Sequence, residues 1–373
     1  MPVNLALGHV SNDFLIAALV IYSLSVVAFA GDFAFGRPRR AQTSGRAQQS
    51  QQRAAALATV GAAASAAPAV PAGGPDAPAG GPDVPAGGPD VPAGGAGSGS
   101  GRTDSMPEVA LPPLRAIREA GRWVQAAIAL SAVGVLAHTV AVVTRGLAVH
   151  RAPWGNMYEF VTALTCVAAI FFLFVMIRYR AWALGVFVMG AVVVALGLAE
   201  TLIYTAAGQL VPALQSYWLD IHVTAMTLAT GIFFVAAVLG AVYITLDSYA
   251  RRVAAGRAAP DHPIVRRLPT IEQIDRLTYR TIVFGFPVWT FGVMAGAIWA
   301  DQAWGRYWGW DPVETWAFIT WVLYAAFLHA RATTGWRGRR AHYIQLLGFT
   351  SLIFNILVVQ VFIAGLHSYA GVS

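Results

Sequence analysis

Two histidines and a cluster of tryptophans are the side chains in this sequence that could do chemistry together. His222 opens one long apolar stretch, and His367 follows the last one. Six of the 12 tryptophans fall between residues 299 and 321, and Trp304, Trp308 and Trp310 share one short loop with glycine spacers. Neutral imidazoles bind metals, and indole faces pack on large planar molecules. These residues predict a site for a planar ligand, provided that the fold brings them together.

The composition indicates that membrane helices position these residues. The chain is 57% hydrophobic and 12% charged, whereas soluble domains average about 25% charged residues. A membrane core needs about 20 apolar helical residues. Eight stretches qualify: 12–31, 123–143, 157–177, 182–203, 222–245, 281–300, 313–331 and 343–364. The sequence therefore predicts an all-α integral membrane protein with an N-terminal helix (1–32) and a seven-helix domain (119–373).

The first stretch lacks the basic start and the cleavage site of a signal peptide, so we interpret it as a spanning helix. Between it and the second stretch lies a polar insert, 33–118, in which Pro-Ala-Gly-Gly-Pro-Asp repeats with a period of seven. Because proline and glycine occur in every copy, a helix is excluded. We expect a disordered cytoplasmic linker, and we favour a plain spacer over a docking segment.

The arginines predict how the chain is oriented. If both termini are extracytoplasmic, only Arg145, Arg151 and Arg306 of the 25 basic residues face outward, as the positive-inside rule requires. The net charge of +7 thus indicates membrane orientation and not nucleic-acid binding. The wealth of arginine, alanine and glycine favours a bacterial genome, so we expect a bacterial plasma membrane. His222, the tryptophan loop and His367 then share the extracytoplasmic face.

A planar ligand held by two neutral imidazoles suggests haem, because low-spin iron accepts two axial nitrogens. Arg306 and Arg151 could pair with haem propionates, and lipid headgroups are equally good partners for them. An interfacial tryptophan belt explains one or two indoles at each helix end, but not three in one loop. The single cysteine, Cys166, excludes a disulfide framework, and no CxxCH motif occurs. We expect Cys166 to be a small buried hydrophobe.

Three further residues have open roles. His329 lies about 27 Å along its helix from Asp311, near the cytoplasmic boundary, where it either serves a site or reaches toward water. His138 falls within the second span, and we favour a structural hydrogen-bonding role for it. Asp311 either caps the seventh span, with Pro312 at the first helical position, or acts as a catalytic acid.

Several motifs resemble a known family. The run from Trp304 to Trp316, Trp-Gly-Arg-Tyr-Trp-Gly-Trp-Asp-Pro-Val-Glu-Thr-Trp, resembles the WWD signature of haem-handling membrane proteins. The segments 214–223, 316–329, 365–369 and 156–159 resemble the CcsA/ResC family (labelled CcsB in some bacteria) of system II cytochrome c biogenesis. The resemblance covers about 145–373, with the motifs in the right order.

The resemblance implies a haem-transferring subunit of a cytochrome c synthase, in which haem b is both bound ligand and substrate. Residues at the positions of His222 and His367 ligate the iron outside, and the histidine at the position of His329 serves an inner-leaflet site with a ResB-family partner. The WWD loop, 304–316, holds the macrocycle; its matching residues are Trp304, Arg306, Trp308, Trp310, Asp311 and Trp316.

In that family the complex acts as a cytochrome c haem lyase. It joins the haem vinyl groups to the thiols of a CxxCH motif in apocytochrome c, which thiol-reducing proteins keep reduced, and it involves no nucleic acid. The alternative is a passive haem exporter or binding module, with attachment done by the partner protein. A quinol oxidoreductase would need two stacked pairs of intramembrane histidines, and His138 and His329 lie at different depths.

Overall fold

The computed structural model describes residues 3–36, 117–118, 120–208, 216–260, 262–333 and 335–367. All helices in this part of the chain belong to one unit, comprising residues 1–39 and 113–373. Most of the linker predicted at 33–118 lies outside the described residues, as do Leu214, Gln215 and the last six residues. Residues 33–35 are described, and they form the last turn of the first helix instead of the start of the linker.

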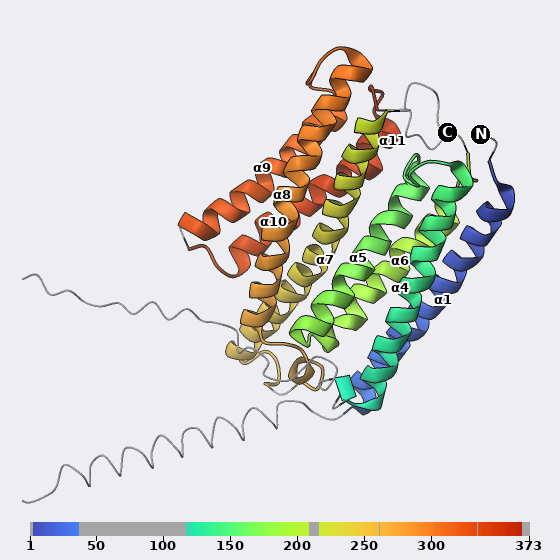
Figure 1. Ribbon diagram of the computed structural model, residues 1–373. Coiled ribbons are helices and arrows are strands. Elements are labelled where there is room, and N and C mark those ends of the chain that lie inside the picture. Colours follow the sequence, from blue (N-terminus) through green and yellow to red (C-terminus); the bar gives the residue numbers. More distant parts are fainter. Residues whose placement is uncertain are drawn as a thin grey trace, which may run out of the picture. The chain divides into compact units, whose positions relative to one another are not determined.

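Eight helices in the described part are long and apolar enough to cross a membrane, as predicted (Figure 1). No strand occurs in the described ranges, so the chain is an all-α, multi-pass membrane protein. The helices are α1 (Leu5–Phe35), α4 (Arg122–Val149), α5 (Met157–Tyr179), α6 (Gly185–Leu202), α7 (Tyr217–Ala254), α8 (Ile271–Trp304), α9 (Pro312–Thr333) and α10 (Arg339–Phe354).

Short turns complete these elements. The 3₁₀ turns η1 (Trp182–Leu184) and η3 (Val265–Arg267) precede α6 and α8. A π-helical turn, η4 (Asn355–Val359), and α11 (Gln360–Phe362) continue α10 toward the C-terminal tail. Because π-turns are rare and occur often at functional sites, the π-turn makes the end of this last span a candidate part of a site.

Two helices extend well beyond their predicted spans. We predict spans at 222–245 and 281–300, but α7 runs to Ala254 and α8 begins at Ile271. The added turns carry charged residues, which hydropathy excludes from a span but which a helix outside the apolar layer accepts. At the start of α8, Thr270 and Gln273 form a reciprocal capping box. Caps and backbone hydrogen bonds therefore set these helix ends, and hydropathy does not.

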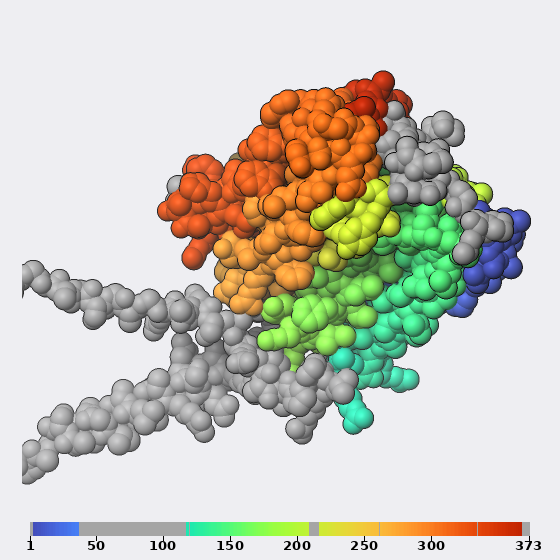
Figure 2. Space-filling view, turned by 45° about the horizontal axis from the view of Figure 1, so that its top comes forward, coloured from blue at the N-terminus to red at the C-terminus, as the bar shows by residue number. Residues whose placement is uncertain are grey.

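The unit has two halves that meet along α5 and α7. In the first half, α1 packs on α4 and α6, and α5 packs on α4 and α6. In the second, α7 packs on α8 and α10, and α9 packs on α10. The first-half helices, blue to green, and the second-half helices, yellow to red, lie on opposite sides of the unit (Figures 1 and 2).

Glycines allow α7 and α8 to approach closely. A Cβ atom at Gly285 would lie 2.9 Å from the Phe233 ring, and one at Gly292 would lie 2.7 Å from the Met226 sulfur. Gly292 and Gly296 are four residues apart, which is the small-residue spacing that lets membrane helices pack backbone to backbone. This packing brings the start of α7 against the end of α8, where the histidine at the head of α7 lies.

Candidate functional site

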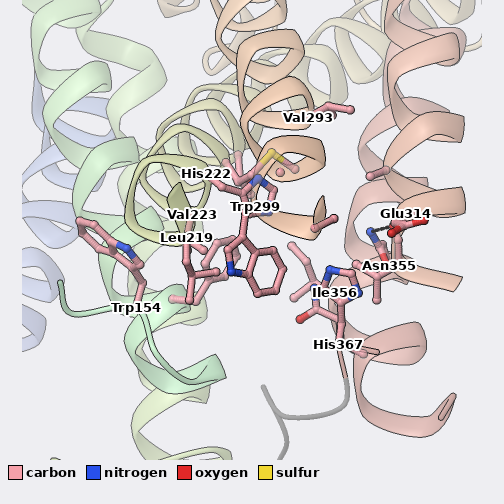
Figure 3. Close-up of a pocket in the computed structure, with 18 of the residues that line it drawn as sticks. Trp154, Leu219, His222, Val223, Val293, Trp299, Glu314, Asn355, Ile356 and His367 are labelled. Atoms are coloured by element: carbon pink, nitrogen blue, oxygen red, sulfur yellow. Dashed lines mark hydrogen bonds between the residues drawn. The ribbon is translucent and has the colours of Figure 1, made fainter. Parts of the chain in front are cut away.

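A pocket lies where α7 and α9 begin and where α8 and the last span end (Figure 3). Its volume is about 160 Å³. Apolar and aromatic side chains form most of the wall, and the segment 152–157 before α5 closes one side. Four of the residues predicted from the sequence line it, namely His222, Trp304, Trp308 and His367.

His222 lies in the second turn of α7 and is oriented by the backbone of α8. Its Nδ1 atom is 2.8 Å from the carbonyl oxygen of Gly292. Because a carbonyl can only accept, Nδ1 carries the proton, and Nε2 is the nitrogen with the lone pair. A Cβ atom at Gly296 would lie 2.6 Å from the imidazole, so only glycine leaves room for it. This is the arrangement in which proteins hold metal-binding histidines.

His367 is oriented by Asp311. Its Nδ1 atom lies 2.8 Å from Oδ1 of Asp311, and the backbone N–H of Leu366 donates to Oδ2 of the same carboxylate at 2.7 Å. Burial alone would raise the pKa of Asp311, but the hydrogen bonds from His367, Leu366 and Val313 together lower it below its ordinary value. Because the ionised Asp311 carboxylate can only accept, Nδ1 of His367 carries the proton, and Nε2 is the nitrogen with the lone pair.

Asp311 is also the cap of α9. Its Oδ1 atom accepts from the backbone N–H of Val313, and Pro312 occupies the first helical position, as the sequence predicts for a cap. Glu314 reaches back across this cap, because its Oε2 atom accepts from the backbone N–H of Asp311 and of Gly309. The local motif Asp-Pro-Val-Glu thus holds the loop before α9 in one conformation.

Trp299 separates the two imidazoles (Figure 3). Its indole is nearly parallel to the His222 ring, with centroids 6.3 Å apart and an interplanar angle of 9°. It lies edge-on to the His367 ring at 6.0 Å, and Trp304 contacts both Trp299 and His367 edge-on. The two histidines therefore converge on one aromatic slot, and an indole fills it.

Other residues predicted for the site lie outside the pocket wall. Trp310 is 64% exposed, and Trp316 packs on Phe354. Arg306 is exposed, and its guanidinium covers Gly309. His329 is exposed at the opposite end of α9.

The secondary predictions from sequence have clear outcomes. Arg151 binds Glu159 at 2.8 Å inside a buried ion cluster. His138 is fully buried beside Tyr22, which suits the structural role that we favour. Cys166 is buried, as expected.

Sequence reasoning missed Trp299, the glycines behind His222, and Asn355. The four-residue spacing of Gly292 and Gly296 is a signal that could have pointed to close helix packing. Asn355 lines the pocket from the π-helical turn, and its amide nitrogen donates to the carbonyl oxygen of Val313 at 3.2 Å. No local pattern marks Trp299 as the indole between the histidines, because that position depends on how α7, α8 and the tail meet.

The two imidazoles and the aromatic wall fit haem, but the volume of the pocket limits how a porphyrin could be placed there. Two imidazoles that present Nε2 atoms and an aromatic wall suit a porphyrin with axial nitrogen ligands. Small-molecule pockets usually enclose about 300–1,000 Å³, so 160 Å³ is too small for a macrocycle. Because Trp299 contacts both imidazoles, a porphyrin placed between His222 and His367 would take the position of this indole.

The fold and the site define a multi-pass helical membrane protein with a histidine-bearing aromatic pocket at one end of its spans. Residues 154–367 match the model of the cytochrome c assembly protein family. The chain belongs to this family, and within it to the CcsA/ResC group.

Two relatives illustrate the relationship. The chain is 34% identical to the cytochrome c biogenesis protein CcsA of Gloeobacter violaceus, over 65% of this chain and 86% of that protein. It is 35% identical to the protein of the same name from Guillardia theta, over 62% of this chain and 81% of that protein.

A solved structure, that of the cytochrome c haem lyase CcmF, is similar with a TM-score of 0.46 and 20% identity. The match covers 66% of this chain and 43% of that one. A likeness this distant carries no information on function.

Proposed function

We propose that this chain is the haem-transferring subunit of a system II cytochrome c synthase. One observation carries the proposal: His222 and His367 line one aromatic pocket, and each holds its Nδ1 atom against an oxygen acceptor. Both Nε2 atoms are thereby prepared for a metal. Membership of the cytochrome c assembly family supports haem b as the molecule that brings this metal, as substrate and as bound ligand.

In this proposal the chain contributes binding and orientation. His222 and His367 would hold the haem iron, Trp304 and Trp308 would contact the macrocycle, and the Trp299 indole would move to make room for it. Thioether formation needs a vinyl group held close to a cysteine thiol of apocytochrome c. Such positioning can lower a barrier by up to about 7–11 kcal/mol. A ResB-family membrane protein completes the complex, and thiol-reducing proteins supply apocytochrome c with free thiols.

The arginine distribution supports an outward-facing pocket in a bacterial plasma membrane. Arg178, Arg251, Arg252, Arg331 and Arg339 lie at the helix ends opposite the pocket. Cytoplasmic ends of spans are the arginine-rich ones. The pocket is then extracytoplasmic, on the side where apocytochrome c receives its haem.

His329 has a separate role in this proposal. It lies exposed at the arginine-rich end of α9, away from the pocket. An exposed imidazole at this depth is accessible to a neighbouring protein, so we assign it to an inner-leaflet haem site that the ResB-family partner completes. Haem loaded there would precede haem in the outer pocket.

The test is to produce the full chain with its ResB-family partner and to compare His222→Ala, His367→Ala and the double variant with wild type. We expect each single variant to lose the bis-histidine absorption spectrum and the double variant to lose most outer-pocket haem. His150→Ala is the matched control, because His150 is exposed at the end of α4. An unchanged spectrum in the double variant rejects the proposal. Full attachment to a CxxCH peptide without haem in this chain favours the passive binding module.

A further inference from the structure

Glu314 is a buried residue in the pocket wall, and within the described part of the chain only one of its two carboxyl oxygens accepts hydrogen bonds. It is 8% exposed. Its Oε2 atom accepts the backbone N–H groups of Gly309 at 2.9 Å and Asp311 at 3.1 Å. Its Oε1 atom is buried and has no hydrogen-bond partner among the described residues. A buried acceptor without a donor is unfavourable. At this position in the pocket wall, Oε1 could accept a hydrogen bond from a bound molecule, or it could take up a proton.

Asp311, for which the sequence leaves both a cap and a catalytic acid open, has no comparable atom. Its Oδ1 atom is bonded to His367 and Val313, and its Oδ2 atom to Leu366. It also lies behind His367 and is absent from the pocket wall. Asp311 is therefore a positioning residue, whereas Glu314 belongs to the pocket wall that also contains both histidines.

We propose that Glu314 is a catalytic residue that carries the proton during thioether formation in this pocket. The inference rests on the proposed function, because it concerns the reaction of a macrocycle held between His222 and His367. Two observations support it independently of that reaction: the unpartnered Oε1 atom, and the two backbone hydrogen bonds to Oε2 that hold the same side chain in one conformation. General acid–base groups work when they are held within reach of the proton that they move.

The step balances without an oxidant or a reductant. Glu314 takes the proton from a cysteine thiol of the CxxCH segment, which breaks the S–H bond. The sulfur then forms a bond to the inner vinyl carbon while the vinyl π bond breaks. Glu314 returns the same proton to the outer vinyl carbon and ends as the carboxylate it was at the start.

The experiment uses Glu314→Gln in the full chain with its ResB-family partner. Glutamine keeps an oxygen for the two backbone N–H groups, so the cap and haem loading are expected to persist. The attachment rate to a CxxCH peptide, measured per haem-loaded complex, is expected to fall about 100-fold, as when a positioned acid–base group is removed. The matched control is Glu200→Gln, because Glu200 binds Tyr158 outside the pocket wall and its loss leaves the rate unchanged. A wild-type rate in Glu314→Gln overturns the inference.

A second variant keeps the inference testable if glutamine disturbs the loop. In Glu314→Ala, added formate is expected to restore part of the attachment rate per loaded complex, and added chloride is not. No rescue, with haem loading intact, contradicts the proton-carrier role. Failure of the proposed function is a different result, since it requires that the His222 and His367 variants keep their haem spectrum.

Discussion

The Nδ1 atom of His367 lies 2.8 Å from Oδ1 of Asp311, although 56 residues separate the two in the chain. The same carboxylate caps α9 and accepts the backbone N–H of Leu366. One aspartate therefore links the loop before α9, the C-terminal tail and the orientation of an imidazole. Because the carboxylate is nearly buried, it accepts these hydrogen bonds where water competes little.

Replacing Asp311 by alanine should release His367. Loss of a group that orients a metal-binding histidine typically costs about 10- to 100-fold in affinity, and we expect a loss of this size in haem affinity. Haem titration with absorption spectra is the measurement. Asp301→Ala is the control, because Asp301 lies in the last turn of α8 and outside the pocket wall. Equal affinity in Asp311→Ala and wild type would show that Asp311 serves only as a cap.

Alanine at Gly296 should displace His222. The new Cβ atom would lie 2.6 Å from ring atoms of the imidazole, which therefore has to move. Overpacking of this kind costs about 1–3 kcal/mol of stability, and the bis-histidine spectrum should be lost. Gly197→Ala is a matched control, because a Cβ atom at Gly197 meets nothing within 4 Å. Thermal unfolding and haem spectra test both variants, and a native spectrum in Gly296→Ala contradicts the geometry.

Removing the Trp299 indole should speed haem entry. The indole contacts His222 on its face and His367 at its edge, and a porphyrin has to break these contacts. Each aromatic pair is worth about 0.5–1.5 kcal/mol, so the two pairs amount to about 1–3 kcal/mol, and Trp299→Ala should associate with haem roughly 5- to 150-fold faster. Stopped-flow mixing measures the rate. Trp310→Ala, at a 64% exposed position, should leave it unchanged. A slower Trp299→Ala variant would make Trp299 a platform for the ring and not a placeholder.

The ion cluster beside the pocket should be essential for stability. Glu159 accepts from Arg145 at 3.0 Å and from Arg151 at 2.8 Å, and the side chains of Glu159 and Arg145 are 1% and 5% exposed. Glu159→Ala leaves the buried Arg145 and the partly buried Arg151 without their anion, and breaking a buried pair costs about 3–5 kcal/mol. Thermal unfolding should show a large loss. The exposed Arg251→Ala should show almost none, because its pair with Asp247 is solvated. Equal stability of the two variants contradicts this role.

Much of the fold could be predicted because it depends on local properties of the chain. A run of about 20 apolar residues identifies a span wherever it occurs, and all eight predicted spans are helices. The cap at Asp311 and Pro312 could also be predicted, since a cap acts over three or four residues. The ends of α7 and α8 could not be predicted, because a hydropathy average excludes the charged turns that continue a helix beyond the membrane.

By itself the sequence determined the eight spans, the arginine-rich ends that indicate orientation, and the chemical types of the site residues. Hydropathy, charge and short motifs depend only on residues that are close together in the chain. Only the tertiary structure decided that Gly292 orients His222, that Asp311 orients His367, and that Trp299 stands between the two rings. These contacts join residues far apart in the chain. They exist because glycine-mediated packing of α7 on α8 and the return of the last span bring distant backbones together.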